Sequence, residues 1–162
     1  MTTIVGFTEA SGDRLFNAAA VFHRGRVIGI YRKWHPAIRQ SLYSAGDRAP
    51  VFTIDGVTFG IIICNDSNFP EPARQLAANG ATLLFVASNN ALPPPKADVV
   101  RDARAADIAH ATTLGVWVVR ADVAGRAQEL VSYGSSAIVD SSGVVRQTSE
   151  PFVEQLLVAE IP

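Results

Sequence analysis

The sequence of 162 residues has little of three features that define large classes of proteins: cysteine, excess charge and long apolar runs. One cysteine forms no internal disulfide, so nothing in the chain requires an oxidising compartment. The net charge of −1 at pH 7 gives no electrostatic basis for binding nucleic acid or an anionic membrane. No apolar run has the length of a membrane span, and the first residues do not resemble a signal peptide. These absences predict a cytoplasmic protein with no nucleic-acid or membrane partner.

The histidines give no indication of a metal site. His23, His35 and His110 lie far apart in the sequence, with no ligand spacing around them. We therefore expect no metal, and no motif predicts another cofactor. The length and the content of 48% hydrophobic and 18% charged residues fit one domain, residues 1–162, with a real core.

The only cysteine stands where an apolar run ends. Residues 58–63 predict a strand buried on both faces, and polar residues 65–68 follow Cys64 directly. Pro70 then marks the start of a predicted helix over residues 70–79. A side chain at such a strand-to-helix turn is held out of the sheet beside free backbone N–H groups, which suits a nucleophile. A free cysteine more often packs as a small core hydrophobe, and that alternative stays open.

Lys33 is the second candidate for the same site. It follows a strand predicted for residues 26–31, which forms a hairpin with residues 15–23. A lysine after a strand is most often a solvated surface charge. If Lys33 instead lies near Cys64, its ammonium has a clear use, because a fixed positive charge activates a thiol and stabilises an oxyanion.

Two motifs surround the candidate residues. The first, C-x-D-x-x-F-P-E, consists of Cys64, Asp66, Phe69, Pro70 and Glu71. The second, N-x-A…G-x-V-x-G-x-Y-R-K-x-H, consists of Asn17, Ala19, Gly25, Val27, Gly29, Tyr31, Arg32, Lys33 and His35. They stand in the correct order and resemble the nucleophile segment and the lysine segment of the nitrilase (carbon–nitrogen hydrolase) superfamily. A weaker match covers the hairpin predicted for residues 133–145, so the resemblance extends over nearly the whole chain.

The resemblance implies an α/β fold, an α-β-β-α sandwich truncated at its N-terminus. It also implies hydrolysis of a non-peptide carbon–nitrogen bond, in an amide, carbamoyl or nitrile substrate, through a Glu-Lys-Cys triad and a thioester. Cys64 would be the nucleophile, and Lys33 and the backbone N–H of Asn65 would bind the oxyanion. Asp66, Phe69, Pro70 and Glu71 would support the turn structurally.

Asn89 and Asn90 are candidate substrate-binding residues. They follow the strand predicted for residues 82–87, and ligands bind at the carboxyl ends of strands in α/β sheets. A plain turn is an equally good interpretation. The remaining predicted elements are strands at residues 3–7, 51–54, 115–120 and 156–161 and a helix at Lys96–Leu114.

A catalytic glutamate is missing from the expected place. Glu9 is the only glutamate before Lys33, and it aligns with a G-x-x-E position near a strand end rather than with the catalytic one. We therefore expect the chain to correspond to the C-terminal two-thirds of a family member, with a segment normally preceding it. The loop at residues 37–47 also has Arg39, Gln40 and Ser41 where many members carry a second glutamate.

Two other functions stay open. The first is a catalytically impaired homologue or fragment that acts as a binding or assembly subunit. The second is an unrelated α/β domain in which Cys64 is a core residue. Arg104 and Asp107, spaced i,i+3 on the long helix, are either a surface ion pair or part of the dimer face that the resemblance implies. We expect a homo-oligomer formed through that helix and the C-terminal strands.

Overall fold

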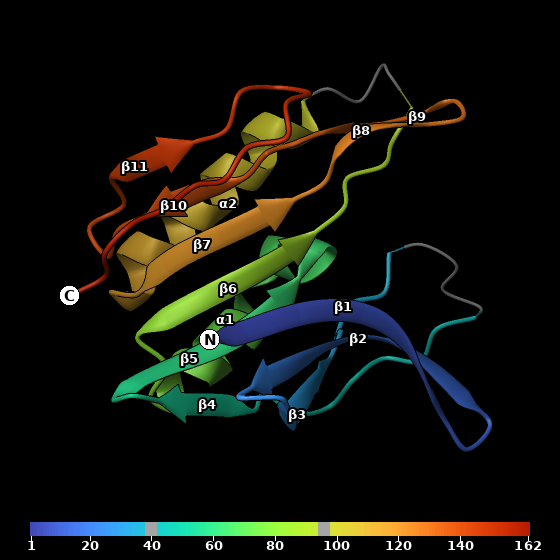
Figure 1. Ribbon diagram of the computed structural model, residues 1–162, viewed down its shortest axis with the longest axis vertical. Coiled ribbons are helices and arrows are strands. Elements are labelled where there is room, and N and C mark those ends of the chain that lie inside the picture. The colour runs from blue at the N-terminus through green and yellow to red at the C-terminus, as the bar shows by residue number, and fades with distance from the viewer. Residues whose placement is uncertain (38–41, 94–97) are drawn as a thin grey trace.

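Two β-sheets lie face to face, and two helices cover the outer side of the larger sheet (Figure 1). The computed structural model describes residues 1–37, 42–93 and 98–162. The small sheet has the order β1-β2-β3 and is antiparallel throughout. Its strands are β1 (Thr2–Ser11), β2 (Arg14–His23) and β3 (Arg26–Arg32).

The large sheet has the order β11-β10-β7-β6-β5-β4. Its three central strands, β5 to β7, are parallel, and the strands on both sides pair antiparallel. The strands are β4 (Val51–Ile54), β5 (Val57–Ile63), β6 (Leu83–Ser88), β7 (Trp117–Asp122), β10 (Ala137–Val139) and β11 (Val145–Thr148). A separate ribbon joins β8 (Ala124–Ala127) to β9 (Leu130–Tyr133).

The helices connect the parallel strands, as the sequence pattern predicts. A short 3₁₀ helix, η1 (Cys64–Asn68), and α1 (Pro70–Ala78) lead from β5 to β6, and α2 (Val99–Leu114) leads from β6 to β7. Pro70 occupies the first turn of α1, where its missing N–H costs no hydrogen bond. The start of the long helix predicted at Lys96 lies outside the described residues.

The alternation along β5 separates two hydrophobic cores. Ile62 points to the helical layer, where it packs with Leu76 and Val118 among the buried residues. Ile61 and Ile63 point the other way, into the core between the two sheets. The unbroken apolar run therefore arises because β5 is buried on both faces, which confirms the prediction for this strand.

The small sheet leaves its outer face uncovered among the described residues. The register places Val5, Phe7, Phe22, Val27 and Ile30 on this face, opposite the core between the sheets. Each of these side chains is between 37% and 54% exposed. The described residues therefore form three layers, helical, β and β.

One predicted strand is wrong. Residues 156–161 form no strand, and Leu156 and Val158 are 85% and 67% exposed. The side chain of Gln147 holds this tail instead, through bonds of 2.6 and 3.1 Å to the backbone of Val158. An apolar pattern specifies a strand only where a neighbouring strand pairs with it, and in this tail only Ile161 packs on the core between the sheets.

Candidate active site

Cys64 lies at the carboxyl end of β5 in a strained backbone conformation. Its φ of 45° falls in the left-handed region, which residues other than glycine rarely adopt. Cys64 is partly buried and packs at the edge of the core between the sheets. Strain of this kind persists only where the surrounding contacts enforce it, and the next residues of the turn supply those contacts.

Asp66 holds this turn through three hydrogen bonds. One carboxylate oxygen accepts the Tyr31 hydroxyl at 2.9 Å and the Ile63 N–H at 3.1 Å, and the other accepts the His35 N–H at 2.8 Å. Burial raises the pKa of Asp66, and the three hydrogen bonds and the charge of Lys33 act against that rise. The carboxylate joins the turn to the end of β3 and is fully buried, so it fixes the backbone rather than facing a substrate.

Lys33 is buried rather than solvated. The residue is only 5% exposed. Its backbone N–H donates to the Asn17 carbonyl and its carbonyl accepts from the Gly46 N–H, each at 2.8 Å. Lys33 and Cys64 line the same cavity of about 430 Å³, between the two sheets at the carboxyl ends of β5, β6 and β7. The interpretation of Lys33 as a surface charge is therefore wrong.

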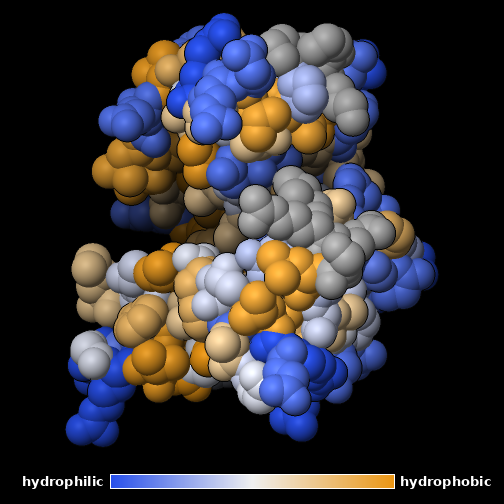
Figure 2. Space-filling view, turned by 90° about the vertical axis from the view of Figure 1, so that its right-hand side faces the viewer, coloured by the Kyte–Doolittle hydropathy of each residue, from blue (hydrophilic) through white to orange (hydrophobic). Residues whose placement is uncertain are grey.

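Figure 2 looks onto the edge of the molecule toward which the parallel strands point. A recess on this surface separates an upper from a lower group of side chains. A second cavity of about 390 Å³ adjoins the first through Cys64 and Asn89, which line both. The sulfur is thus placed where two hollows meet, a suitable position for a group that reacts with a bound molecule.

The three asparagines are gathered around Cys64. Asn65 donates from its side chain to the carbonyl of His35 at 3.1 Å, which leaves its backbone N–H at the start of the 3₁₀ helix. Asn89 accepts a hydrogen bond of 2.8 Å from Ser132. Asn90 is 7% exposed, and its side-chain oxygen lies 3.5 Å from the sulfur of Cys64. Asn90 is therefore a contact of the sulfur and not merely a turn residue.

The residues expected to support the turn do so unequally. Phe69 stacks on the His35 ring at a centroid distance of 3.9 Å, and Pro70 starts α1. Glu71 is exposed in the first turn of α1 and lines neither cavity. Its carboxylate suits the positive end of the helix dipole.

A buried ion pair supports the turn from the helical side. Arg120 donates to both carboxylate oxygens of Asp107, at 2.7 and 2.6 Å, and to the Ser67 hydroxyl at 3.1 Å. The Ser67 hydroxyl donates in turn to the Cys64 carbonyl at 2.8 Å. Asp107 therefore pairs with Arg120 in the core, whereas Arg104 donates to the Ser135 and Ser136 carbonyls. The interpretation of Arg104 and Asp107 as a surface ion pair is wrong.

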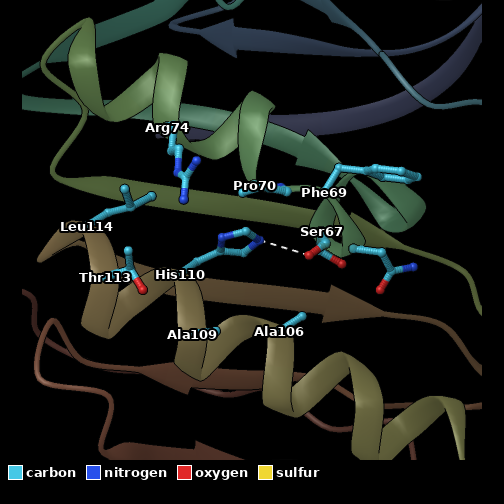
Figure 3. A pocket seen from close by; sticks show the side chains of 10 residues that line it. Ser67, Phe69, Pro70, Arg74, Ala106, Ala109, His110, Thr113 and Leu114 are labelled. Carbon is cyan, nitrogen blue, oxygen red and sulfur yellow. Dashed lines mark hydrogen bonds between the residues drawn. The ribbon is translucent and has the colours of Figure 1, made fainter.

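His110 completes this support and lies in a groove between α1 and α2 (Figure 3). Its Nε2 donates to the Ser67 carbonyl at 2.9 Å. Burial lowers the pKa of His110, because the charged imidazolium would lose its hydration. The groove has a volume of about 320 Å³ and does not include Cys64.

Glu9 lies on the wrong face of the small sheet to serve Cys64. Its carboxylate accepts two hydrogen bonds from Arg32, at 2.7 and 2.6 Å, and these lower its pKa. The register places Glu9 on the outer face, and it lines neither cavity. No carboxylate lines the cavity that Lys33 and Cys64 share, among the described residues.

Three polar residues of the site were not singled out from the sequence. The Ser88 hydroxyl is buried beside the shared cavity with no partner among the described residues. Asp122 and Ser135 bind each other and Asn90. Ser88 and Asp122 are the last residues of β6 and β7, and Ser135 lies shortly before β10, so their position at or near a strand end was the available signal. Arg39, Gln40 and Ser41 lie outside the described residues.

The fold defines the class of protein. Two sheets face each other with helices on the outer side of the larger one, and a strained cysteine lies at the carboxyl end of a central parallel strand. The family profile described as carbon-nitrogen hydrolase matches residues 1–162, and the chain belongs to this family. A nitrilase from Pyrococcus abyssi is 33% identical over 161 residues, which cover 98% of this chain and 58% of the relative.

Two further comparisons give a second kind of relative and a solved structure with the same fold. A glutamine-dependent NAD(+) synthetase from Xanthomonas campestris is 31% identical, over 99% of this chain and 30% of the relative. The crystal structure of a carbon-nitrogen hydrolase from Helicobacter pylori superposes with a TM-score of 0.85 at 22% identity, over 92% of this chain and 57% of that one. The chain thus spans between 30% and 58% of the length of these relatives.

The described residues also bear on membranes and metals. None of the helices in residues 1–37, 42–93 and 98–162 is both long and apolar enough to cross a membrane. In the same residues, no group of three His, Cys, Asp or Glu side chains is arranged to hold a metal ion.

Proposed function

We propose that this chain carries the nucleophile and the oxyanion site of an enzyme that hydrolyses a non-peptide carbon–nitrogen bond in a small amide, carbamoyl or nitrile substrate. The observation that carries the proposal is the pairing of Cys64, in its strained turn, with the buried Lys33 on one cavity. A thiol held in a fixed place beside a buried ammonium is suited to nucleophilic attack.

The proposed reaction has two halves. The Cys64 sulfur forms a bond to the substrate carbon, and the Lys33 ammonium and the Asn65 N–H stabilise the negative charge that develops on the carbonyl oxygen of an amide or carbamoyl group or on the nitrogen of a nitrile. In an amide or carbamoyl substrate the carbon–nitrogen bond breaks, the leaving nitrogen takes a proton, and a thioester remains. A nitrile first gives a thioimidate, which takes up water and loses ammonia to form the same thioester. Water then attacks the thioester, which releases the acid and returns the proton to the sulfur.

Both halves need a group that moves protons, and we propose that a carboxylate from outside the described residues supplies it. Lys33 must stay charged for its role, Glu9 is bound to Arg32, and Asp66 is enclosed in the turn. One positioned acid or base contributes about 10²- to 10⁴-fold to such reactions. The 162-residue chain alone is therefore expected to react with activated esters and to hydrolyse amides poorly.

The test follows acylation and turnover separately. Treatment with 4-nitrophenyl acetate should add one acetyl group at Cys64, seen by mass spectrometry, while the release of ammonia from simple amides should be roughly 10²- to 10⁴-fold below ordinary enzyme rates. Cys64→Ala should abolish acylation, and Lys33→Met should slow it. A sulfur that reacts only after denaturation would contradict the proposal and favour a core cysteine.

The second candidate function is a binding or assembly subunit without turnover. The absence of a carboxylate from the described lining of the shared cavity favours it. The two candidates differ in one outcome, because addition of a segment that carries the missing acid or base should restore amide hydrolysis only if Cys64 is a working nucleophile. We further propose that the chain forms a homodimer or larger assembly through α2 and the C-terminal strands, with the neighbouring groove as part of the contact.

A further inference from the structure

Asp122, the last residue of β7, is the partly buried centre of a network next to Cys64, and its partners Asn90 and Ser135 are buried. One of its carboxylate oxygens accepts three hydrogen bonds: from the Ser135 N–H at 2.9 Å, the Ser135 hydroxyl at 2.6 Å and the Asn90 side-chain amide at 3.2 Å. The other oxygen accepts the Asn90 backbone N–H at 3.3 Å. This one carboxylate therefore joins the segment after β6 to the segment before β10.

The network fixes which way the Asn90 amide points. A carboxylate only accepts hydrogen bonds, so the NH₂ group of Asn90 must face Asp122. The Ser135 hydroxyl, 3.5 Å from the same NH₂, is already donated to Asp122 and has only acceptor capacity left on that side. The side-chain oxygen of Asn90 must then face the opposite way, where it lies 3.5 Å from the sulfur of Cys64.

This orientation assigns the hydrogen bond at the sulfur. Because a carbonyl oxygen accepts and cannot donate, the Cys64 thiol donates its S–H to Asn90. The lone pairs of the sulfur are then directed away from Asn90. With the amide turned over, its NH₂ group would donate to the sulfur and favour a thiolate instead.

We propose that Asp122 and Asn90 are positioning residues that hold the Cys64 thiol in one rotamer, with its S–H engaged by Asn90 until a base removes the proton. Asp122 acts through Asn90 and touches no reacting atom. The inference rests on the proposed role of Cys64 as the nucleophile, and it adds the residues that fix the orientation and the protonation of its thiol.

The decisive measurement is the rate of alkylation of Cys64 by iodoacetamide as a function of pH. In Asp122→Leu, the carboxylate that holds the Asn90 NH₂ is lost, so the amide can turn and donate its NH₂ to the sulfur. The midpoint of the rate profile should move to lower pH, with alkylation roughly tenfold faster below the midpoint of the unchanged protein.

Asn90→Asp provides a variant with the opposite expected sign. Its carboxylate keeps an acceptor and adds negative charge beside the sulfur, so the midpoint should move to higher pH. Lys33, Asp66, Asp102 and Arg120, the other charged groups around the turn and its cavities, are unchanged in these variants. A network with a purely structural role would lower thermal stability, and the midpoint would then move only as far as the change of charge requires.

Asp122→Asn is the matched control. It loses the same charge at the same place, but it keeps an oxygen that can accept from the Ser135 N–H, the Ser135 hydroxyl and the Asn90 NH₂. Its midpoint should therefore move less than that of Asp122→Leu. Equal midpoints in Asp122→Leu and Asp122→Asn would overturn the inference.

The result is separable from that for the proposed function, because alkylation requires no turnover. If 4-nitrophenyl acetate acylates Cys64 while the midpoints of Asp122→Leu and Asp122→Asn fail to diverge, the positioning role is wrong and the nucleophile stands. If the midpoints diverge but no acylation occurs, the orientation of the sulfur stands and the hydrolase proposal is wrong. Circular dichroism melts verify that each variant is folded, and Asp122→Ala replaces Asp122→Leu in the same comparison if the leucine variant does not fold.

Discussion

Four polar side chains with almost no solvent exposure hold the nucleophile turn in place. Asp66 binds it from the side of β3. Arg120 of β7 and His110 of α2 bind it through Ser67, and Asp107 holds Arg120. A buried polar group costs free energy unless it is hydrogen-bonded, and removal of one partner leaves the other exposed to that cost. These contacts provide a physical reason for the left-handed backbone at Cys64.

His110 makes stability depend on pH, which is a prediction at this scale. Its folded-state pKa lies below the ordinary value of 6.5, with burial as the main cause, Asp107 acting to raise it and Arg120 to lower it. As pH falls through 6.5, the unfolded chain binds a proton that the folded chain still excludes. The contribution of neutral His110 to the free energy of unfolding is therefore complete above pH 6.5 and is lost as pH falls toward the folded-state pKa.

His110→Gln keeps a donor for the Ser67 carbonyl and cannot titrate. The free energy of unfolding, measured with urea at about pH 7.5 and about pH 5.5, should fall less in this variant than in the unchanged protein. Thr113→Val lies in the same groove, carries no titrating group and should keep the original difference. Equal differences in His110→Gln and the unchanged protein would show that His110 is not excluded from protonation.

At the scale of elements, the close packing of α1 on β5 depends on Gly60. A Cβ at this position would lie 2.8 to 3.0 Å from side-chain atoms of Leu76, which is fully buried. Gly60 therefore lets α1 approach the strand that ends at Cys64. The distance between helix and sheet is set here by one missing side chain.

Gly60→Ala should destabilise the protein by about 1–3 kcal/mol, because α1 or Leu76 must move in a packed core. Gly6→Ala is the control, since β1 offers space there: the nearest atom to its Cβ would be 4.0 Å away. Urea denaturation compares the two variants directly. A Gly60→Ala variant as stable as Gly6→Ala would mean that α1 accommodates the methyl group without cost.

At the scale of the whole molecule, two surfaces remain apolar without a covering element in the described residues: the outer face of the small sheet and the groove between α1 and α2. Contiguous apolar surface of this kind favours association. The groove between α1 and α2 is the surface at which we expect two copies of the chain to associate.

Sedimentation velocity at micromolar concentration should therefore give a dimer. Ala109→Glu puts a charge on an exposed residue of α2 that lines the groove, and should shift the distribution to monomer. Ala10→Glu makes the same change at an exposed position of β1, and should leave the dimer intact. A monomer in the unchanged protein, or equal effects of both changes, would contradict association through the groove.

The sequence by itself determined the local elements of the site. The apolar run before Cys64 specified a strand buried on both faces, and Pro70 marked the first turn of α1. The two motifs together indicated the family that the comparisons then showed. These features are local in the chain, because strand periodicity, helix starts and short motifs are each set by neighbouring residues.

Only the tertiary structure decided which polar groups meet. Lys33 became buried because the end of β3 packs against β5, and Asp107 bonded Arg120 rather than Arg104 because β7 passes under α2. The contact between Asn90 and the Cys64 sulfur required three separate strand ends to converge. The tail at residues 156–161 failed as a strand for the same reason: pairing and burial depend on long-range packing, which no local pattern in the sequence specifies.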